Sequence, residues 1–140
     1  MKKTLLVAII LLSLGAANAQ KICSKTGYDT EFTWRDNQLC KNTGYDVVLT
    51  IRSSQVCKVS GYDVLYTVRD NQICKGTGYD VLFTIRDNQI CKGTGYDVVY
   101  TVRDTQICSG TGYDVLYTIR DGYINKVELA ATIHAVNYIY

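Results

Sequence analysis

Six cysteines are the residues of this chain with the most obvious chemistry. The 140 residues include six Cys, one His and no Pro. The cysteines recur every 17 residues, at Cys23, Cys40, Cys57, Cys74, Cys91 and Cys108. An even number of cysteines in an exported chain normally indicates disulfides, but one cysteine per interval cannot bridge within its own interval. With no CxxC pair and no Cys/His cluster, the sequence predicts no metal site.

Polar side chains follow the same interval. Gly-Tyr-Asp and Thr-x-Arg each occur six times. The Asp and Arg residues could pair across one face, and the simpler interpretation is a neutralised solvent face. In the functional interpretation, rows of Tyr, Thr, Asp and Arg bind a repetitive partner such as a glycan. The individual residues that we assign to that surface are Thr67, Arg69, Thr84, Arg86, Thr101, Arg103, Thr118 and Arg120.

One loop segment is similar to a known calcium-binding motif. The residues from Gly76 to Asp80, with the two apolar residues that follow, resemble the G-x-G-x-D-x-U core of calcium-binding nonapeptide repeats in some secreted toxins and proteases. The first glycine is replaced by Lys25, Asn42 and Val59 in the earlier units. Those repeats place a calcium turn every nine residues, whereas the second turn here is Arg-Asp-Asn-Gln, so half of each site is missing. We expect no calcium and no other cofactor, and assign the glycine to a turn with positive φ.

Catalysis is not indicated. His134 is the only histidine and lies outside the repeat, and no serine occupies a nucleophile motif. An active site needs one asymmetric arrangement of groups in different roles, whereas a repeat supplies six similar surfaces. We therefore predict a protein that is not an enzyme.

Each 17-residue unit predicts two β-strands. Over residues 64–69 the apolar residues Val64, Tyr66 and Val68 have a period of two, and β-branched and aromatic types dominate there. Asp70-Asn71 is typical of a two-residue hairpin turn, after which residues 72–75 form a shorter strand. This turn pairs Arg69 with Gln72, Val68 with Ile73, Thr67 with Cys74 and Tyr66 with Lys75. The core face would then hold Val64, Tyr66, Val68 and Ile73, and the second face Leu65, Thr67, Arg69 and Cys74.

Two all-β architectures fit six tandem 17-residue strand-turn-strand repeats. We favour an antiparallel β-hairpin array because of the turn chemistry, and a parallel β-solenoid is the alternative. In the array, cysteines of successive units lie about 9.6 Å apart, beyond the roughly 7 Å that a disulfide tolerates. In the solenoid they stack about 4.8 Å apart and could bridge in pairs. The six cysteines are thus a possible disulfide or thiol ladder whose state distinguishes the two folds.

Both ends of the chain depart from the repeat. Residues 1–19 have the features of a signal peptide, with a basic start, an apolar stretch and the small-x-small site Ala17-Asn18-Ala19. Residues 20–123 form the six-repeat β domain. Residues 124–140 change to mixed three- and four-residue spacing, and Asn125 and Glu128 have the spacing of a capping box. We predict a C-terminal α-helix there that caps an apolar end or face of the array.

Charge and location bound the function. The formal net charge is +2, and removing Lys2 and Lys3 with the leader leaves 13 basic and 13 acidic residues. A neutral mature chain argues against nucleic-acid binding. We predict a secreted or periplasmic bacterial protein, with no membrane span after signal cleavage, that acts by surface interaction or self-assembly in a structural role. The partner would be another copy or an extracellular polymer. The alternative is a glycan- or small-ligand-binding module that uses the repeated Tyr, Asp and Arg rows.

Overall fold

Twelve short strands make up most of the molecule. The computed structural model describes residues 19–139, and side chains through residue 137, so nearly all of the predicted leader lies outside the described residues. Strands of four and six residues alternate along the chain. They are β1 (Lys21–Ser24), β2 (Thr30–Arg35), β3 (Gln38–Lys41), β4 (Val47–Arg52), β5 (Gln55–Lys58), β6 (Val64–Arg69), β7 (Gln72–Lys75), β8 (Val81–Arg86), β9 (Gln89–Lys92), β10 (Val98–Arg103), β11 (Gln106–Ser109) and β12 (Val115–Arg120).

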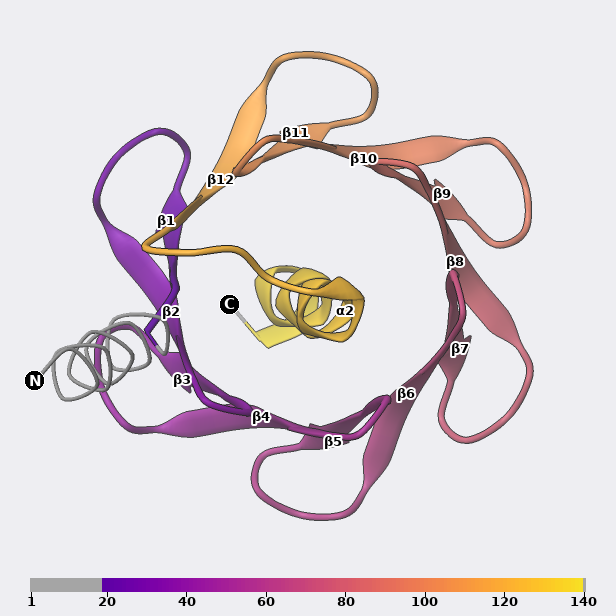
Figure 1. Cartoon of the computed structure of the whole chain (residues 1–140), viewed down its shortest axis with the longest axis horizontal. Coiled ribbons are helices and arrows are strands. Elements are labelled where there is room, and N and C mark those ends of the chain that lie inside the picture. Colours follow the sequence, from indigo (N-terminus) through magenta and orange to yellow (C-terminus); the bar gives the residue numbers. More distant parts are fainter. Residues whose placement is uncertain (1–18, 140) are drawn as a thin grey trace, which may run out of the picture.

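The strands close into a barrel. Each strand pairs antiparallel with its neighbours in the chain, and β1 pairs with β12 to complete the ring (Figure 1). The prediction of six antiparallel hairpins is confirmed, and the parallel solenoid is not the fold. The antiparallel pairing decides between them, and in the turn that joins β6 to β7 Asp70 has a φ of 59°, in the left-handed region that Asp tolerates better than most residues. Closure leaves no sheet edge exposed.

The predicted hairpin register is also confirmed. Arg69 lies opposite Gln72, Val68 opposite Ile73, Thr67 opposite Cys74 and Tyr66 opposite Lys75.

A β-bulge overturns part of the predicted face assignment. On the β5 side of β6, Val56 lies opposite Tyr66 and Cys57 opposite Val64, so Leu65 is the extra residue. One extra residue shifts the in-out alternation, so Leu65 packs against the core while Val64 lies on the face of Cys57. Placing Val64 in the core and Leu65 on the second face was therefore wrong. The same irregularity occurs once per unit around the barrel.

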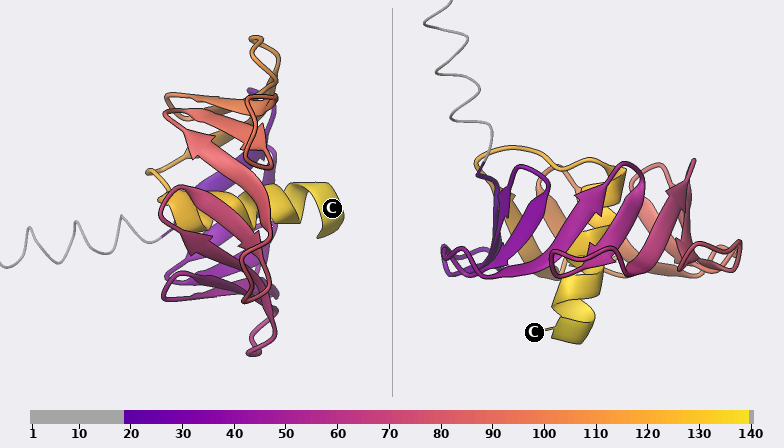
Figure 2. Two further views of the ribbon diagram at one scale, coloured as in Figure 1. Left: turned by 90° about the vertical axis from the view of Figure 1, so that its right-hand side faces the viewer. Right: turned by 90° about the horizontal axis from the view of Figure 1, so that it is seen from below.

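The C-terminal helix runs along the inside of the barrel, and its C-terminal end projects beyond the rim that carries the longer loops (Figure 2). α2 (Lys126–His134) continues into one π-helical segment, η1 (Ala135–Ile139), and both follow the barrel axis (Figures 1 and 2). The predicted capping box is present, with Asn125 and Glu128 bonded reciprocally at 2.8 Å. The helix covers the inner apolar face of the array because a closed barrel presents that face only to its interior. Among the described residues, no helix is long and apolar enough to cross a membrane.

Six loops, which we call petals, flare outward from one rim of the barrel (Figures 1 and 2). Each petal joins a four-residue strand to the next six-residue strand and contains one Gly-Tyr-Asp. The petals are residues 25–29, 42–46, 59–63, 76–80, 93–97 and 110–114. The tight hairpin turns lie at the opposite rim, where the chain also enters α2 (Figure 2).

Candidate functional site

The Thr-x-Arg motif fastens each petal to the barrel wall. In the third unit, the Thr67 hydroxyl donates to the Gly76 carbonyl at 2.7 Å. Arg69 donates through Nη2 to the Thr77 carbonyl at 2.8 Å and through Nε to the Gly78 carbonyl at 3.3 Å. These bonds recur around the ring, and the last unit makes them to the first petal, across the β1–β12 junction.

The predicted surface residues therefore fall into two groups. The four threonines lie between wall and petal, with exposed fractions of 4–8%, and their hydroxyls serve the petal carbonyls. They are Thr67, Thr84, Thr101 and Thr118. The four arginines also bond petal carbonyls, but the petal tyrosines lie over them. No tyrosine was among the individual residues predicted for the binding surface. The arginines are Arg69, Arg86, Arg103 and Arg120.

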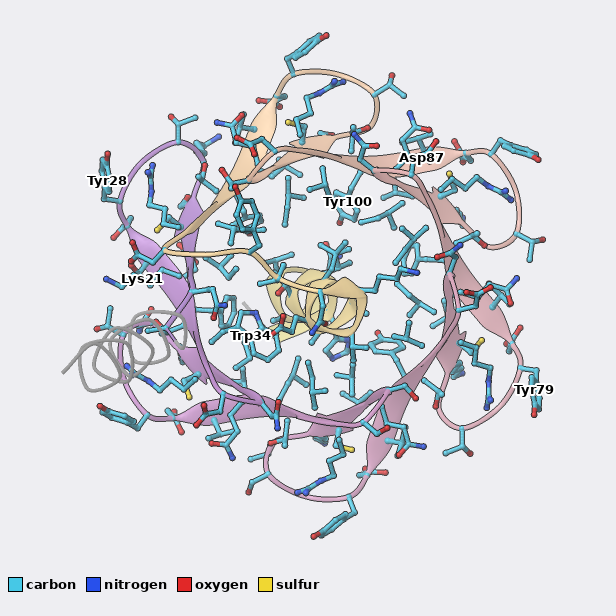
Figure 3. The ribbon with its side chains drawn as sticks, viewed as in Figure 1. Lys21, Tyr28, Trp34, Tyr79, Asp87 and Tyr100 are labelled. Atoms are coloured by element: carbon cyan, nitrogen blue, oxygen red, sulfur yellow. The ribbon has the colours of Figure 1, made fainter. Side chains whose placement is uncertain are left out.

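Each petal carries a tyrosine stacked on an arginine. The Arg69 guanidinium carbon lies 4.1 Å from the ring centroid of Tyr79, and the six equivalent distances span 3.9–4.1 Å. Cation–π contacts of this kind contribute about 0.5–1 kcal/mol at exposed sites. The six rings are still 80–81% exposed, and Tyr28 and Tyr79 point away from the barrel (Figure 3). The ring of petals thus presents six preorganised aromatic side chains to solvent.

The arginines do not pair with the Gly-Tyr-Asp carboxylates. Among the described residues, the one ion pair joins Lys21 to Asp121, at 3.7 Å. Instead, each guanidinium bonds backbone carbonyls and stacks on a tyrosine ring. A sequence signal for the tyrosines was present, since an aromatic residue that recurs between Gly and Asp in a loop has no strand face to pack on.

The six cysteines lie on the outer side of the wall beneath the petals. All six are free and 1% exposed, as an antiparallel array with one cysteine in every second strand requires. Burial raises the pKa of the Cys40 thiol, and the charge of Arg35 partly offsets this rise. Thiols that are buried and protonated react slowly. Within the described part of the chain, no group of three or more His, Cys, Asp or Glu residues could hold a metal ion.

Side chains of the wall fix the helix inside the barrel. Three of them, from the first, third and fifth units, form hydrogen bonds with α2 or η1, and Trp34 and Tyr100 point into the lumen (Figure 3). The pairs are Trp34 Nε1 to Thr132 Oγ1 at 3.2 Å, Tyr66 hydroxyl to His134 Nδ1 at 2.5 Å, and Tyr100 hydroxyl to Asn137 Oδ1 at 2.9 Å. A wall with nearly six-fold symmetry does not by itself orient a helix, so these contacts set its rotation.

Comparison with known families decides the classification. Residues 42–138 match the model of a family described as "6-fold beta flower protein". The chain belongs to the 6-fold beta flower family. The matched segment runs from the second petal through α2 and into η1, and such a repeat family fits a non-enzymatic protein. Comparisons with curated proteins and with solved structures found no match.

Proposed function

We propose that this beta flower protein is exported and binds a repetitive extracellular glycan through its ring of petals. The observation that carries the proposal is the set of six exposed tyrosines, each stacked on an arginine. Tyrosine combines an apolar ring with a polar hydroxyl, and it is enriched with arginine in binding hot spots. The ring can stack on the C–H face of a sugar, while the hydroxyl and the neighbouring Asp bond its hydroxyls.

The petals are rigid before binding, which favours affinity. Two arginine bonds and one threonine bond hold each petal, so little loop entropy remains to be lost on binding. One exposed ring supplies only a weak contact. Six equivalent rings on one rim can engage successive units of a polymer, and linkage of weak sites can raise affinity by about 10²–10⁴.

Self-assembly has less support than glycan binding. Self-assembly would need unpaired sheet edges, or an apolar outer face of the kind predicted from Leu65 and Cys74. The barrel pairs each of its strands on both sides, Leu65 packs against the core, and Cys74 is 1% exposed. The apolar and edge surfaces that drive association are therefore covered.

A glycan array tests the proposal directly. The probe is the protein comprising residues 20–140, and we expect binding to polymeric glycans well above binding to their monosaccharides. Removing alternate petal rings in one Y28A/Y62A/Y96A variant should lower the apparent affinity at least tenfold. Tyr123 is 73% exposed but lies outside the petals, so Y123A is the matched control and should bind as the wild type does. An array without hits, or a triple variant that binds normally, contradicts the proposal.

A further inference from the structure

One segment departs from the repeat more than its counterparts. Ser53 stands where the other five units have Asp, and Ser60 stands where they have Thr. Val59 stands where they have Lys, Asn or Gly, and it has a φ of 53°. A β-branched residue is rarely found in that left-handed region. This petal therefore departs from the repeat in sequence, because a β-branched residue occupies a backbone conformation that the other petals share.

The helix packs against the same part of the wall. α2 packs against β4, β5 and β6, which flank and include the departing segment. His134, at the end of α2, shares a hydrogen bond through Nδ1 with the Tyr66 hydroxyl of β6, and the two rings are edge-on with centroids 5.0 Å apart. The chain's one histidine thus faces the petals at residues 42–46 and 59–63.

A cavity lies where these features meet. Its volume is about 440 Å³, and its lining comes from both petals, from β4, β5 and β6, and from His134. Val48, Leu49, Leu65 and Val59 supply an apolar wall. Small-molecule sites are typically clefts of roughly 300–1,000 Å³ with apolar walls and a few polar groups.

The polar groups of the cavity carry opposite charges. Lys58 and Asp46 line it, and both side chains reach solvent. Burial lowers the pKa of His134, so at pH 7 its imidazole is neutral. One cation and one anion beside an apolar wall complement a ligand that has both charges and an aliphatic group. A simple fatty acid would leave Asp46 next to a like charge.

We propose that this cavity binds a small zwitterion with an aliphatic side chain, the class of the apolar free amino acids. The ligand carboxylate would pair with Lys58, its ammonium with Asp46, and its side chain would pack on Val48, Leu49 and Leu65. Counterparts of Lys58 and Asp46 occur in other units, but Val59 occurs in one unit and the helix packs against one side of the wall. The two charged residues therefore belong to the repeat, whereas Val59 and the packed helix make the apolar cavity at this one unit.

Calorimetric titration of the protein comprising residues 20–140 tests the proposal with three probes. L-leucine carries both charges, 4-methylpentanoate lacks the ammonium, and 3-methylbutylamine lacks the carboxylate. We expect L-leucine to bind and each analogue to bind at least about tenfold more weakly, equivalent to ~1.4 kcal/mol. Equal affinity for L-leucine and 4-methylpentanoate, or no L-leucine binding, overturns the proposal.

The repeat provides a matched control for the site. Lys75 occupies the same place in the next unit as Lys58 but does not line the cavity. We expect K58M to weaken L-leucine binding at least tenfold and K75M to leave it unchanged. Equal weakening by both variants would also overturn the proposal. Glycan binding should survive K58M, so this site and the petal surface can fail independently.

Discussion

The outer and inner sides of the barrel wall come from the same 17-residue unit, yet they differ in symmetry. Outside, each unit repeats one set of contacts, from Thr and Arg to petal carbonyls and from Arg to Tyr. Inside, the equivalent wall positions hold Trp34, Ile51, Val68, Ile85, Val102 and Ile119. A regular exterior can serve six equivalent contacts, whereas an interior that varies can hold one helix in one orientation.

The helix explains why the interior must vary. One asymmetric helix cannot present the same surface to six walls, so close packing demands different side chains around it. Trp34 fills the space beside Thr132 and is fully buried. The inner position two residues earlier in each long strand also varies, with Leu49 in one unit and Tyr66, Tyr100 and Tyr117 in others.

The largest expected effect comes from removing the side chain that most breaks the inner symmetry. W34A should lower the free energy of unfolding by about 3–5 kcal/mol, because it opens a cavity and leaves the Thr132 hydroxyl without its indole partner. Urea unfolding monitored by circular dichroism measures the change. W34F, which keeps most of the volume and removes the hydrogen bond, should cost less. If W34A costs under 1 kcal/mol, helix packing does not depend on this contact.

The parts of the fold that follow from local chemistry could be predicted from the sequence. The Asp70-Asn71 turn fixed the hairpin register, and Asn125 with Glu128 located the start of the helix. Barrel closure depends on the twist and shear summed over all strands, which no single unit reveals. The bulge at Leu65 was missed because a two-residue period has no place for an unpaired residue.

Prediction of the candidate site was similarly divided. Repetition identified the Thr-x-Arg rows as a set, but only the backbone path showed that petals fold over them. The threonines therefore hold the petals to the wall, and tyrosines such as Tyr79 form the exposed surface in their place. The cavity at His134 could not be predicted because it joins residues that are far apart in the sequence.

The first residue of each petal has a positive φ, which allows one unit to be compared with the next. Val59 has a φ of 53° and Gly76 one of 57°, so the same backbone holds a disfavoured residue in one petal and a favoured one in the next. We expect V59G to stabilise the protein by about 1 kcal/mol and G76A to destabilise it by a similar amount. Paired thermal or urea unfolding measures both. Shifts of the same sign would show that backbone strain does not govern these positions.

A smaller effect is expected where one arginine fastens a petal. R69K keeps the charge but cannot reproduce the paired bonds to the Thr77 and Gly78 carbonyls. Amide hydrogen exchange should therefore quicken in residues 76–80, while the free energy of unfolding falls by under about 1 kcal/mol. The petal at residues 93–97, held by Arg86, serves as the internal control. Uniform quickening of all petals would show that they do not move separately.

The smallest effect is a pH dependence that belongs to the inner side alone. Burial lowers the pKa of His134 below its ordinary value of about 6.5, so over a window below pH 6.5 the unfolded chain binds a proton that the folded one does not. The free energy of unfolding should therefore fall as the pH falls through that window. Tyr66, Asp46 and Lys58 are the titratable groups around the imidazole.

The variant H134N isolates this contribution, because an amide can form a hydrogen bond with the Tyr66 hydroxyl without titrating. Urea unfolding at pH 7 and pH 5 should show a smaller loss of stability for H134N than for the wild type. The acidic side chains are the same in both proteins, so their effects cancel in the difference. Equal losses would mean that the imidazole accepts a proton as readily inside the barrel as in the unfolded chain. In that case the barrel interior would not change the protonation of His134, and its asymmetry would be a matter of packing alone.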